Sequence, residues 1–503
     1  MTNKVRRGSG VLMHITSLPG PYGIGSMGRY GRKFIDFLNN AGQKYWQILP
    51  LGPTGYGNSP YQSFSAFAGN PFLIDIEQLI EENYISKEVL AAYDLDGHRQ
   101  RVDYDKIIAQ KIELLKKCYL SFKSMENYKE LKSFKEAHHW LDEYSVFMAL
   151  KEHYKSQPWQ KWAEEHRLRD ADALKNFRES HSDAIEFWVF LQWVFYKQWL
   201  SLKNYANSNG VEIIGDMPIY VSADSSDTWA HPDLFYFDEG SHPVAVAGCP
   251  PDAFSETGQL WGNPLYDWTQ NEENGFEWWI DRMRSSMELY DVIRIDHFRG
   301  FESYWEIPAQ DKTAENGHWV KGPGMKLFKA IHEAIPSMRI IAEDLGFLTE
   351  EVIQLVADSG YPGMKVLQFA FDSREESDYL PHNYDSHCIV YTGTHDNDTV
   401  MGWFETAAKE DVVLAKEYLS LTEDEGYNWG YIRGAWSSVA QTAIAPMQDF
   451  LGLASDHRMN IPSTIGGNWE WRVREEDLSD ALAKRMHRLT KIYGRLEKEH
   501  AKI

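Results

Sequence analysis

The sequence has little of several features that would assign it at once to a familiar class. Three of its 503 residues are cysteine, an odd number spread far apart (Cys118, Cys249 and Cys388), which fits neither a disulfide framework nor a zinc site. The most apolar stretch, residues 185–200, is interrupted by charged and amide side chains and is too short to cross a bilayer. No apolar segment typical of a secretory signal precedes Val11. These absences predict a cytoplasmic chain without a membrane span.

Positive charge is also scarce. The chain carries 51 basic and 74 acidic side chains, and its net charge of -23 repels phosphate backbones and anionic lipid. We therefore expect neither nucleic acid nor a membrane surface as its main partner. Aromatic residues reach 14%, with 19 Trp and 27 Tyr, which fits a large aromatic core or flat rings that pack against sugars. Composition alone favours the core.

No Walker A sequence occurs, and we expect no phosphate-binding glycine loop before a helix. What is present is a series of short apolar runs that end in polar or acidic residues: 11–16, 45–51, 211–216, 292–296, 340–344, 364–371, 388–394 and 443–449. Short apolar runs without strict alternation are typical of strands buried on both faces of a parallel sheet. Eight such strands with helices between them predict an α/β fold, a (β/α)8 TIM barrel, rather than an open doubly wound sheet.

The spacing between these runs is uneven, which predicts insertions. Residues 1–72 and 211–503 would form the catalytic barrel. Residues 73–210 are rich in Lys, Glu, Leu and Trp and predict a helical insertion subdomain. Residues 222–275 are punctuated by Gly, Pro, Asn and Asp, so we expect a loop-rich insertion over the active site at the C-terminal face of the barrel.

Acidic residues stand at the ends of four predicted strands. They are Asp216, Asp296, Glu343 and Asp396, with Arg294 and His395 beside two of them. The carboxyl ends of barrel strands meet at one mouth, so these side chains are expected to converge there. Each one alone is equally well explained as a helix cap or a loop ion pair. Four carboxylates that repel one another indicate metal binding or acid/base chemistry.

Glycosyl transfer explains this cluster better than a metal site does. No D-x-D-x-D-G calcium loop is present, and the cation of Arg294, two residues before Asp296, would share its strand face and weaken metal binding. We therefore expect no metal and no cofactor. Glycosyl transfer needs one ionised carboxylate to attack the anomeric carbon and one protonated carboxyl to donate to the leaving oxygen. An arginine close to the nucleophile would keep it ionised.

An ordered set of segments covers nearly the whole chain, from about Val11 to Arg472. The segments are VLMHITSLPGPYGIGSMG, LGPTGYGNSPYQSFSAFAGNP, IIGDMPIYVSADSSDTW, PPDAFSETGQLWGNPLYDW, IRIDHFRGFESYWEIP, IIAEDLGFLT, GMKVLQFAF, YTGTHDNDT and MNIPSTIGGNWEWR. In content and order they resemble the 4-α-glucanotransferases (amylomaltase, or disproportionating enzyme) of the α-amylase-like group. One isolated match would be weak, whereas the ordered set is specific.

The resemblance implies roles for individual residues. Asp296 in IRIDHFRG matches the nucleophile, Glu343 in IIAEDLG matches the acid/base, and Asp396 in THDND matches the transition-state stabiliser. Residues implied to bind substrate are Ser59, Tyr61, Asp216, Asp252, Gln259, Trp261, Arg294, Asp344, His395 and Asn468. Without the resemblance, Tyr61, Trp261 and Asn468 are equally well explained as a core aromatic, a loop anchor and a turn residue.

The implied reaction is transfer of α-1,4-glucan segments between maltooligosaccharides, starch or glycogen-type glucans. It retains configuration, with the two reacting carboxyls about 5–5.5 Å apart. The segment around Phe254 and Trp261 is expected to exclude water. Two alternatives stay open: an α-glucan hydrolase with the same carboxylates, and a non-catalytic glucan-binding protein. One departure is visible, because Ser463 stands where the family often has glycine. Serine can occupy a type I turn, so we expect this departure to affect only the shape of the loop.

Overall fold

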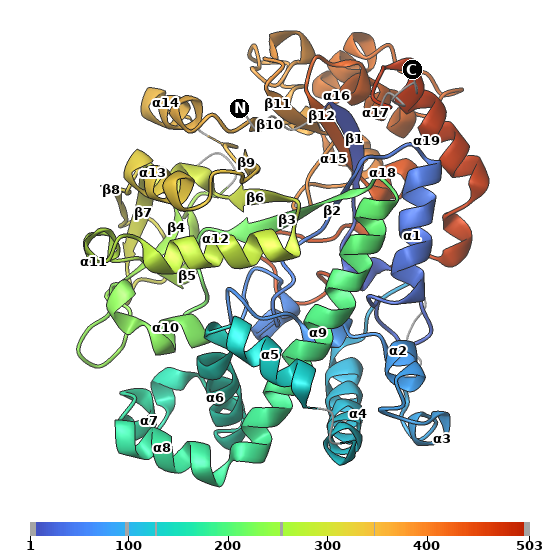
Figure 1. Cartoon of the computed structure of the whole chain (residues 1–503). Helices are drawn as coiled ribbons and strands as arrows, with labels where there is room; N and C mark the ends of the chain where they lie inside the picture. Colours follow the sequence, from blue (N-terminus) through green and yellow to red (C-terminus); the bar gives the residue numbers. More distant parts are fainter. Residues whose placement is uncertain (1–6, 96–99, 126–127, 252–254, 347, 497–503) are drawn as a thin grey trace.

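An eight-stranded parallel sheet forms the centre of the computed structural model, which describes residues 7–95, 100–125, 128–251, 255–346 and 348–496 (Figure 1). The order of its strands is β10 (Gly363–Val366), β11 (Cys388–Tyr391), β12 (Thr442–Pro446), β1 (Gly8–Leu12), β2 (Tyr45–Gln47), β3 (Glu212–Pro218), β6 (Val292–Asp296) and β9 (Ile340–Ala342). The two outermost strands meet where the Ala342 amide donates to the Pro362 carbonyl at 3.0 Å, which closes the barrel. The predicted TIM barrel is confirmed.

Each of the eight predicted runs overlaps one barrel strand, but the first strand begins earlier than expected. The run was expected at residues 11–16, whereas β1 starts at Gly8. Glycine has a low strand propensity, so the sequence did not indicate that the strand begins at Gly8. The structure requires glycine here, because a Cβ on Gly10 would lie 2.6 Å from the carbonyl oxygen of Tyr45 on β2.

Helices surround the barrel sheet (Figure 1). Those that follow barrel strands are α1 (Arg29–Asn40), α9 (Ser182–Ser208), α12 (Glu277–Leu289), α13 (Met325–Ala334), α14 (Glu350–Ser359), α15 (Val400–Thr406), α16 (Lys409–Tyr418), α17 (Tyr427–Ser437), α18 (Met447–Leu451) and α19 (Asp480–Ile492). Helix α14 shows how local sequence sets such bounds: the Thr349 hydroxyl caps its first turn, and Gly360 ends it with φ 68°.

One glycine motif contradicts the expectation from the sequence. Residues 23–28 read G-x-G-x-x-G and directly precede α1. The structure gives these glycines a packing role: a Cβ on Gly25 would lie 1.9 Å from the Ile15 carbonyl, and one on Gly28 would lie 2.1 Å from the Asp75 carboxylate. A carboxylate at this position would repel a phosphate, so the motif does not indicate a nucleotide site.

Residues 73–210 are mainly helical. They contain α2 (Ile76–Glu81), α3 (Lys87–Leu90), α4 (Tyr104–Ser124), α5 (Lys129–Ala137), α6 (Trp140–His153), α7 (Glu164–Arg167), α8 (Ala171–Ser180) and α9. Helix α9 packs on α4, α5, α6 and α8 and also on β3 and α12, so it joins this helical group to the barrel (Figure 1). Within the part of the chain that the structure describes, no helix is long and apolar enough to cross a membrane.

Two buried glutamines of α9 hold the segment that follows β2. Gln192 accepts from the amide of Gly69 at 2.7 Å and donates to its carbonyl at 2.9 Å. Gln198 does the same with Asp75, at 2.7 and 3.2 Å. These paired amide bonds satisfy main-chain groups that would otherwise be buried without partners. They fix the end of the loop that carries Tyr61.

A second sheet stands beside the barrel and includes part of the segment expected to be loop-rich. Its order is β5 (Gln259–Pro264), β4 (Ala245–Cys249), β7 (Ser303–Pro308) and β8 (His318–Lys321), all antiparallel. Helices α10 (Ser226–Ala230) and α11 (Trp268–Glu273) also fall within residues 222–275. The sequence did not indicate β4 and β5, because β7, the second partner of β4, comes from a later part of the chain.

Candidate active site

A cavity of about 740 Å³ lies at the carboxyl ends of the barrel strands. Asp296 is the last residue of β6, Asp396 follows β11, and both line this cavity. Glu343 follows β9, which pairs with β6 on one side, and Asp216 lies in β3, which pairs with β6 on the other. The four acidic residues singled out in the sequence therefore come to one end of the barrel from four strands.

Arg294 contacts two of these carboxylates, those of Asp216 and Asp296. It is two residues before Asp296 on β6, so both side chains point to the same face. Its Nη1 lies 2.9 Å from Asp296 Oδ1 and donates to Asp216 Oδ1 at 2.7 Å, and its side chain is 4% exposed. Burial opposes its charge, yet the two carboxylates raise the pKa of Arg294 well above the usual value. A permanent cation thus stabilises negative charge on Asp296.

Glu343 occupies a different environment. Its Oε2 accepts from the amide of His297 at 2.6 Å, and its Oε1 accepts from the amide of Leu345 at 2.9 Å. Burial, followed by the negative charge of Asp296, raises the pKa of Glu343 to about 7, although Arg294 and the two amides act in the opposite direction. This carboxyl group therefore keeps its proton near neutral pH.

Asp396 is strongly ionised. Burial opposes its charge, but His395 and the side-chain amide of Asn460 outweigh it and hold the pKa of Asp396 at about 2. His395 Nε2 lies 3.3 Å from Asp396 Oδ2, and Asn460 Nδ2 donates to Asp396 Oδ1 at 2.7 Å. The carboxylate is thus a fixed acceptor of hydrogen bonds at the cavity surface.

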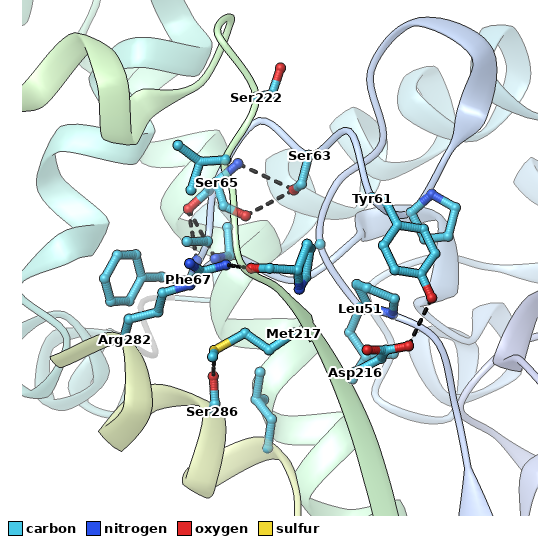
Figure 2. A pocket seen from close by; sticks show the side chains of 18 of the residues that line it. Leu51, Tyr61, Ser63, Ser65, Phe67, Asp216, Met217, Ser222, Arg282 and Ser286 are labelled. Carbon is cyan, nitrogen blue, oxygen red and sulfur yellow. Dashed lines mark hydrogen bonds between the residues drawn. The ribbon is translucent and has the colours of Figure 1, made fainter. Parts of the chain in front are cut away.

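Tyr61 lies between the buried and the exposed acids. Its hydroxyl donates to Asp216 Oδ2 at 2.8 Å, as Figure 2 shows, and lies 3.3 Å from His395 Nδ1. Its ring stacks on that of His395 with centroids 4.9 Å apart. Behind Asp216 is a small cavity of about 50 Å³, room enough for water molecules (Figure 2). Tyr61 separates this internal space from the large cavity.

Comparisons with known proteins decide the family. Residues 13–478 match the family described as 4-alpha-glucanotransferase. The chain belongs to this family. It is 52% identical over 487 residues to the 4-alpha-glucanotransferase of Clostridium butyricum, covering 96% of this chain and 100% of that protein. It is 48% identical to the corresponding protein of Thermus thermophilus, covering 97% and 99%. The resemblance inferred from the ordered segments is confirmed.

A solved structure also closely matches the chain. The amylomaltase from Streptococcus agalactiae in complex with acarbose superposes with a TM-score of 0.96 at 44% sequence identity, covering 98% of this chain and 100% of that one. The amylomaltase from Corynebacterium glutamicum, at 18% identity and a TM-score of 0.74, shares the fold. The glucanotransferase family therefore accounts for the barrel and for the second sheet together.

The remaining residues predicted to bind substrate are placed in three ways. Six of them line the large cavity: Ser59, Tyr61, Gln259, Trp261, His395 and Asn468. The indole of Trp261 donates to Gln259 Oε1 at 3.1 Å, so these two side chains form one unit on β5. Asn468 accepts from the amide of Ile461 at 3.0 Å and thereby fixes a loop over the cavity. Asp252 and Phe254 lie outside the described residues.

Asp344 is placed at the barrel seam instead of the cavity. It accepts from the amide of Met364 at 2.7 Å, and a Cβ on Gly363 would lie 2.3 Å from its carboxylate. Asp344 follows Glu343 directly, and successive side chains at a strand end point in opposite directions. Asp344 therefore links β9 to β10 while Glu343 faces the reacting centre.

Ser463 shows that the departure from the family pattern has a structural cost. Its φ is 62°, in the left-handed region, so the expected type I turn is wrong. Glycine accepts this conformation without a Cβ penalty. We predict that Ser463→Gly raises the free energy of unfolding by about 0.5–1 kcal/mol, measured by urea denaturation. The matched Ser133→Gly, on the exposed face of α5, should lower it.

Two residues of the site were not predicted from the sequence. Asn460 holds Asp396, and His297 donates its amide to Glu343. Asn460 stands in the MNIPST segment, where the sequence shows a departure from the family pattern at Ser463 but not the contact with Asp396. His297 adjoins the nucleophile position, but nothing in a sequence indicates where a main-chain amide will point. Among the described residues, no group of three or more His, Cys, Asp or Glu side chains is arranged to hold a metal ion.

Proposed function

We propose that this chain is a retaining 4-α-glucanotransferase that moves α-1,4-glucan segments between maltooligosaccharides, starch or glycogen-type glucans. The observation that carries the proposal is a contrast between two neighbouring carboxyl groups. Asp296 contacts the buried cation of Arg294, whereas Glu343 has a pKa of about 7. A nucleophilic carboxylate held by a buried cation, beside a carboxyl group that keeps its proton, is the arrangement that glycosyl transfer with retention requires.

The first step forms a covalent glucosyl-enzyme. Glu343 gives its proton to the glycosidic oxygen while a carboxylate oxygen of Asp296 attacks the anomeric carbon. The bond from that carbon to the glycosidic oxygen breaks, and the reducing-end fragment leaves with the proton. In the second step the 4-hydroxyl of an incoming glucan attacks the same carbon. Glu343, now ionised, takes the hydroxyl proton, and the ester bond to Asp296 breaks.

Asp396, His395 and Tyr61 would hold the sugar that is transferred. The ionised Asp396 offers acceptor oxygens to sugar hydroxyls, and His395 keeps it ionised. Tyr61 presents a flat ring above Asp216, suited to the C–H face of a glucose unit. Gln259 and Trp261 on β5 would cover the incoming glucan and limit access of water. These roles agree with those implied by the family segments.

The pH dependence of transfer should report the state of Glu343. The first step needs its proton, and the pKa of Glu343 is about 7. We therefore expect kcat/KM to fall as pH rises through about 7, approaching tenfold per pH unit above it. Initial rates with maltotriose from pH 5 to pH 9 at constant ionic strength would show this limb. A rate that stays level to pH 9 would contradict it, provided that thermal melts show a folded protein throughout.

Incubation with maltotriose tests the proposal against its alternatives. A transferase yields glucose together with longer oligosaccharides while the number of reducing ends stays constant. A hydrolase raises that number, and a non-catalytic glucan-binding protein leaves maltotriose unchanged. We expect chain redistribution at constant reducing ends. If the number of reducing ends instead rises by one for each glucose released, the protein is an α-glucan hydrolase.

The same proposal assigns functions to the larger segments. Residues 1–72 and 211–503 would carry the catalytic barrel, and residues 73–210 a helical subdomain that supports it through α9. Residues 222–275 would form part of the cover over the active site, because Gln259 and Trp261 line the cavity from there. A cytoplasmic location is supported by Cys118 and Cys388, which form no disulfide.

A further inference from the structure

A second large cavity lies between the helical group of residues 73–210 and α12, and we call it the flank cavity. Its volume is about 600 Å³, within the range of pockets that hold small ligands. The end of α5, the start of α6, α10, α12 and the loop after β2 all contribute to its lining (Figure 1). No described residue lines both this cavity and the catalytic cavity. The two are therefore separate places on the molecule.

Hydrogen bonds between distant segments fix the walls of the flank cavity. His138, which follows α5, has its Nε2 3.2 Å from Glu288 Oε2 of α12, and this contact joins two of the walls. On another side, Asp227 of α10 accepts from the amide of Ala66 at 2.8 Å. The side chain of Asp227 is buried in this contact. The cavity is thus preformed, as most ligand sites are.

Aromatic rings form part of the lining. Phe67 stacks on Trp140 with ring centroids 6.1 Å apart and meets Trp278 edge-on at 5.9 Å. Phe67 and Trp278 are buried, whereas Trp140 at the start of α6 is partly exposed. Trp140 is therefore the ring that a ligand in the cavity can contact. A flat indole beside carboxyl and imidazole groups suits the C–H face of a sugar and its hydroxyls.

Three polar atoms of the lining are buried and have no hydrogen-bond partner among the residues that the structure describes. They are Nε1 of Trp140, Nε1 of Trp278 and Oδ1 of Asn274. Buried polar groups without a partner are rare and destabilise a fold, so each one requires an explanation. A ligand rich in hydroxyl groups would offer acceptors to the two N–H groups and a donor to the amide oxygen. Three such atoms around one cavity are therefore explained by a ligand of this kind.

The charge of the lining disfavours an anionic ligand. Its six carboxyl groups are those of Glu143, Asp227, Asp233, Glu277, Asp281 and Glu288, against one guanidinium and three imidazoles. Three of the six already contact a basic side chain, that of Arg169, Arg284 or His138. A phosphate would be repelled, and a cation would compete with these existing contacts. A neutral sugar meets neither obstacle.

One loop connects the flank cavity with the catalytic cavity. Tyr61 lines the catalytic cavity, and Ser65 and Phe67 line the flank cavity. The four steps of chain from Tyr61 to Ser65 span at most about 14 Å. The same three residues surround the small cavity behind Asp216, as Figure 2 shows. The two large cavities therefore lie within the length of one long glucan.

We propose that the flank cavity binds a segment of an α-glucan and holds a long substrate close to the catalytic cavity. The choice of a glucan rests on the proposed function, whereas the site itself rests on the rings, the unpartnered polar atoms and the charge of the lining. A chain held at a second point meets the catalytic cavity at a higher effective concentration. Long glucans gain from this contact. Maltotriose, which is short enough to lie wholly in the catalytic cavity, does not.

Two substitutions test the flank cavity. Trp140→Ala removes the partly exposed ring, and Ala137→Arg adds a long side chain that would fill the cavity and pair with its carboxylates. Each should raise the dissociation constant for glycogen about five- to tenfold in affinity gel electrophoresis, and the KM for amylose by a similar factor. The kcat/KM for maltotriose should stay within about twofold of the wild type. Ala357→Arg, exposed in the last turn of α14, is the matched control and should keep all three values.

Ala137→Arg decides the test if Trp140→Ala fails to fold, since Trp140 also packs on Tyr196 whereas Ala137 is exposed. If Ala137→Arg keeps the wild-type affinity for glycogen, or if Ala357→Arg loses it equally, the flank cavity is not a glucan site. A dimeric wild type that becomes monomeric in Ala137→Arg, measured by light scattering, would assign the cavity to a second copy instead. If the wild type leaves maltotriose unchanged, the proposed function is wrong, and the gel still decides whether the cavity binds glucan.

Discussion

Replacing Asp296 by asparagine is expected to lower kcat for glucan transfer by roughly four to six orders of magnitude. The amide has no negative oxygen to attack the anomeric carbon, so no glucosyl-enzyme forms. The fold should survive, because Arg294 keeps its contacts with Asp216. Rates of maltotriose redistribution under substrate saturation would measure the loss.

The matched control for this variant is Asp358→Asn on the exposed face of α14, where the carboxylate accepts a hydrogen bond from the side-chain amide of Gln354 at 2.7 Å. It should retain wild-type turnover. Calorimetry with maltooligosaccharide should show that the Asp296 variant still binds glucan, which separates lost chemistry from lost binding. Wild-type turnover in the Asp296 variant would rule out the double displacement and favour a non-catalytic binding protein.

Replacing Glu343 by glutamine should cost kcat about two to four orders of magnitude, because neither proton transfer can then occur through this side chain. The same change should also alter how stability depends on pH. The pKa of Glu343 is about 7 in the folded protein against a reference of 4.5, so the folded state holds this proton more tightly than the unfolded chain does. Stability is therefore lost as pH rises from 4.5 to 7, and glutamine removes that loss.

Thermal melts at two pH values would reveal the effect of Glu343 on stability. The glutamine variant must turn its NH2 toward one of the two main-chain amides that Glu343 accepts from, which costs stability at every pH. Its melting temperature relative to the wild type should therefore be higher at pH 8 than at pH 4. The Asp358 variant should show no such difference between the two pH values. If the difference in melting temperature between the glutamine variant and the wild type is the same at pH 4 and pH 8, Glu343 ionises without penalty in the folded protein, and its role as the acid fails.

The barrel could be predicted from the sequence because its strands are buried on both faces. Burial on both faces leaves short apolar runs, and the acids that end them identify the functional end of the barrel. The second sheet could not be predicted in this way. Its strands β4 and β5 are short, β5 is partly exposed, and β4 pairs with β7, which follows α12 and β6 in the chain. Nothing local in residues 222–275 indicates that partner.

Within the site, the charged side chains were easier to predict than the groups that position them. Asp296 and Glu343 are identified by their places at strand ends. The sequence places Asp344 beside Glu343 but does not show where each side chain points. In the structure the two point in opposite directions, and the carboxylate of Asp344 lies at the barrel seam. The role of Asn460 depends on the geometry of its loop, and the role of His297 depends on its main-chain amide. Residue type alone indicates neither role.

The glutamine contacts of α9 bear on how the chain can vary through insertion and deletion. Gln192 and Gln198 bind main-chain atoms of Gly69 and Asp75, so these four hydrogen bonds do not depend on the side chains of the loop. Gly69 itself cannot change, because a Cβ there would lie 2.1 Å from the ring of Phe195. The spacing along the helix has no such freedom. One residue inserted between the two glutamines would rotate Gln198 by about 100° and turn it away from Asp75. Length changes are therefore better tolerated in the connections between α4 and α8 than within α9 itself.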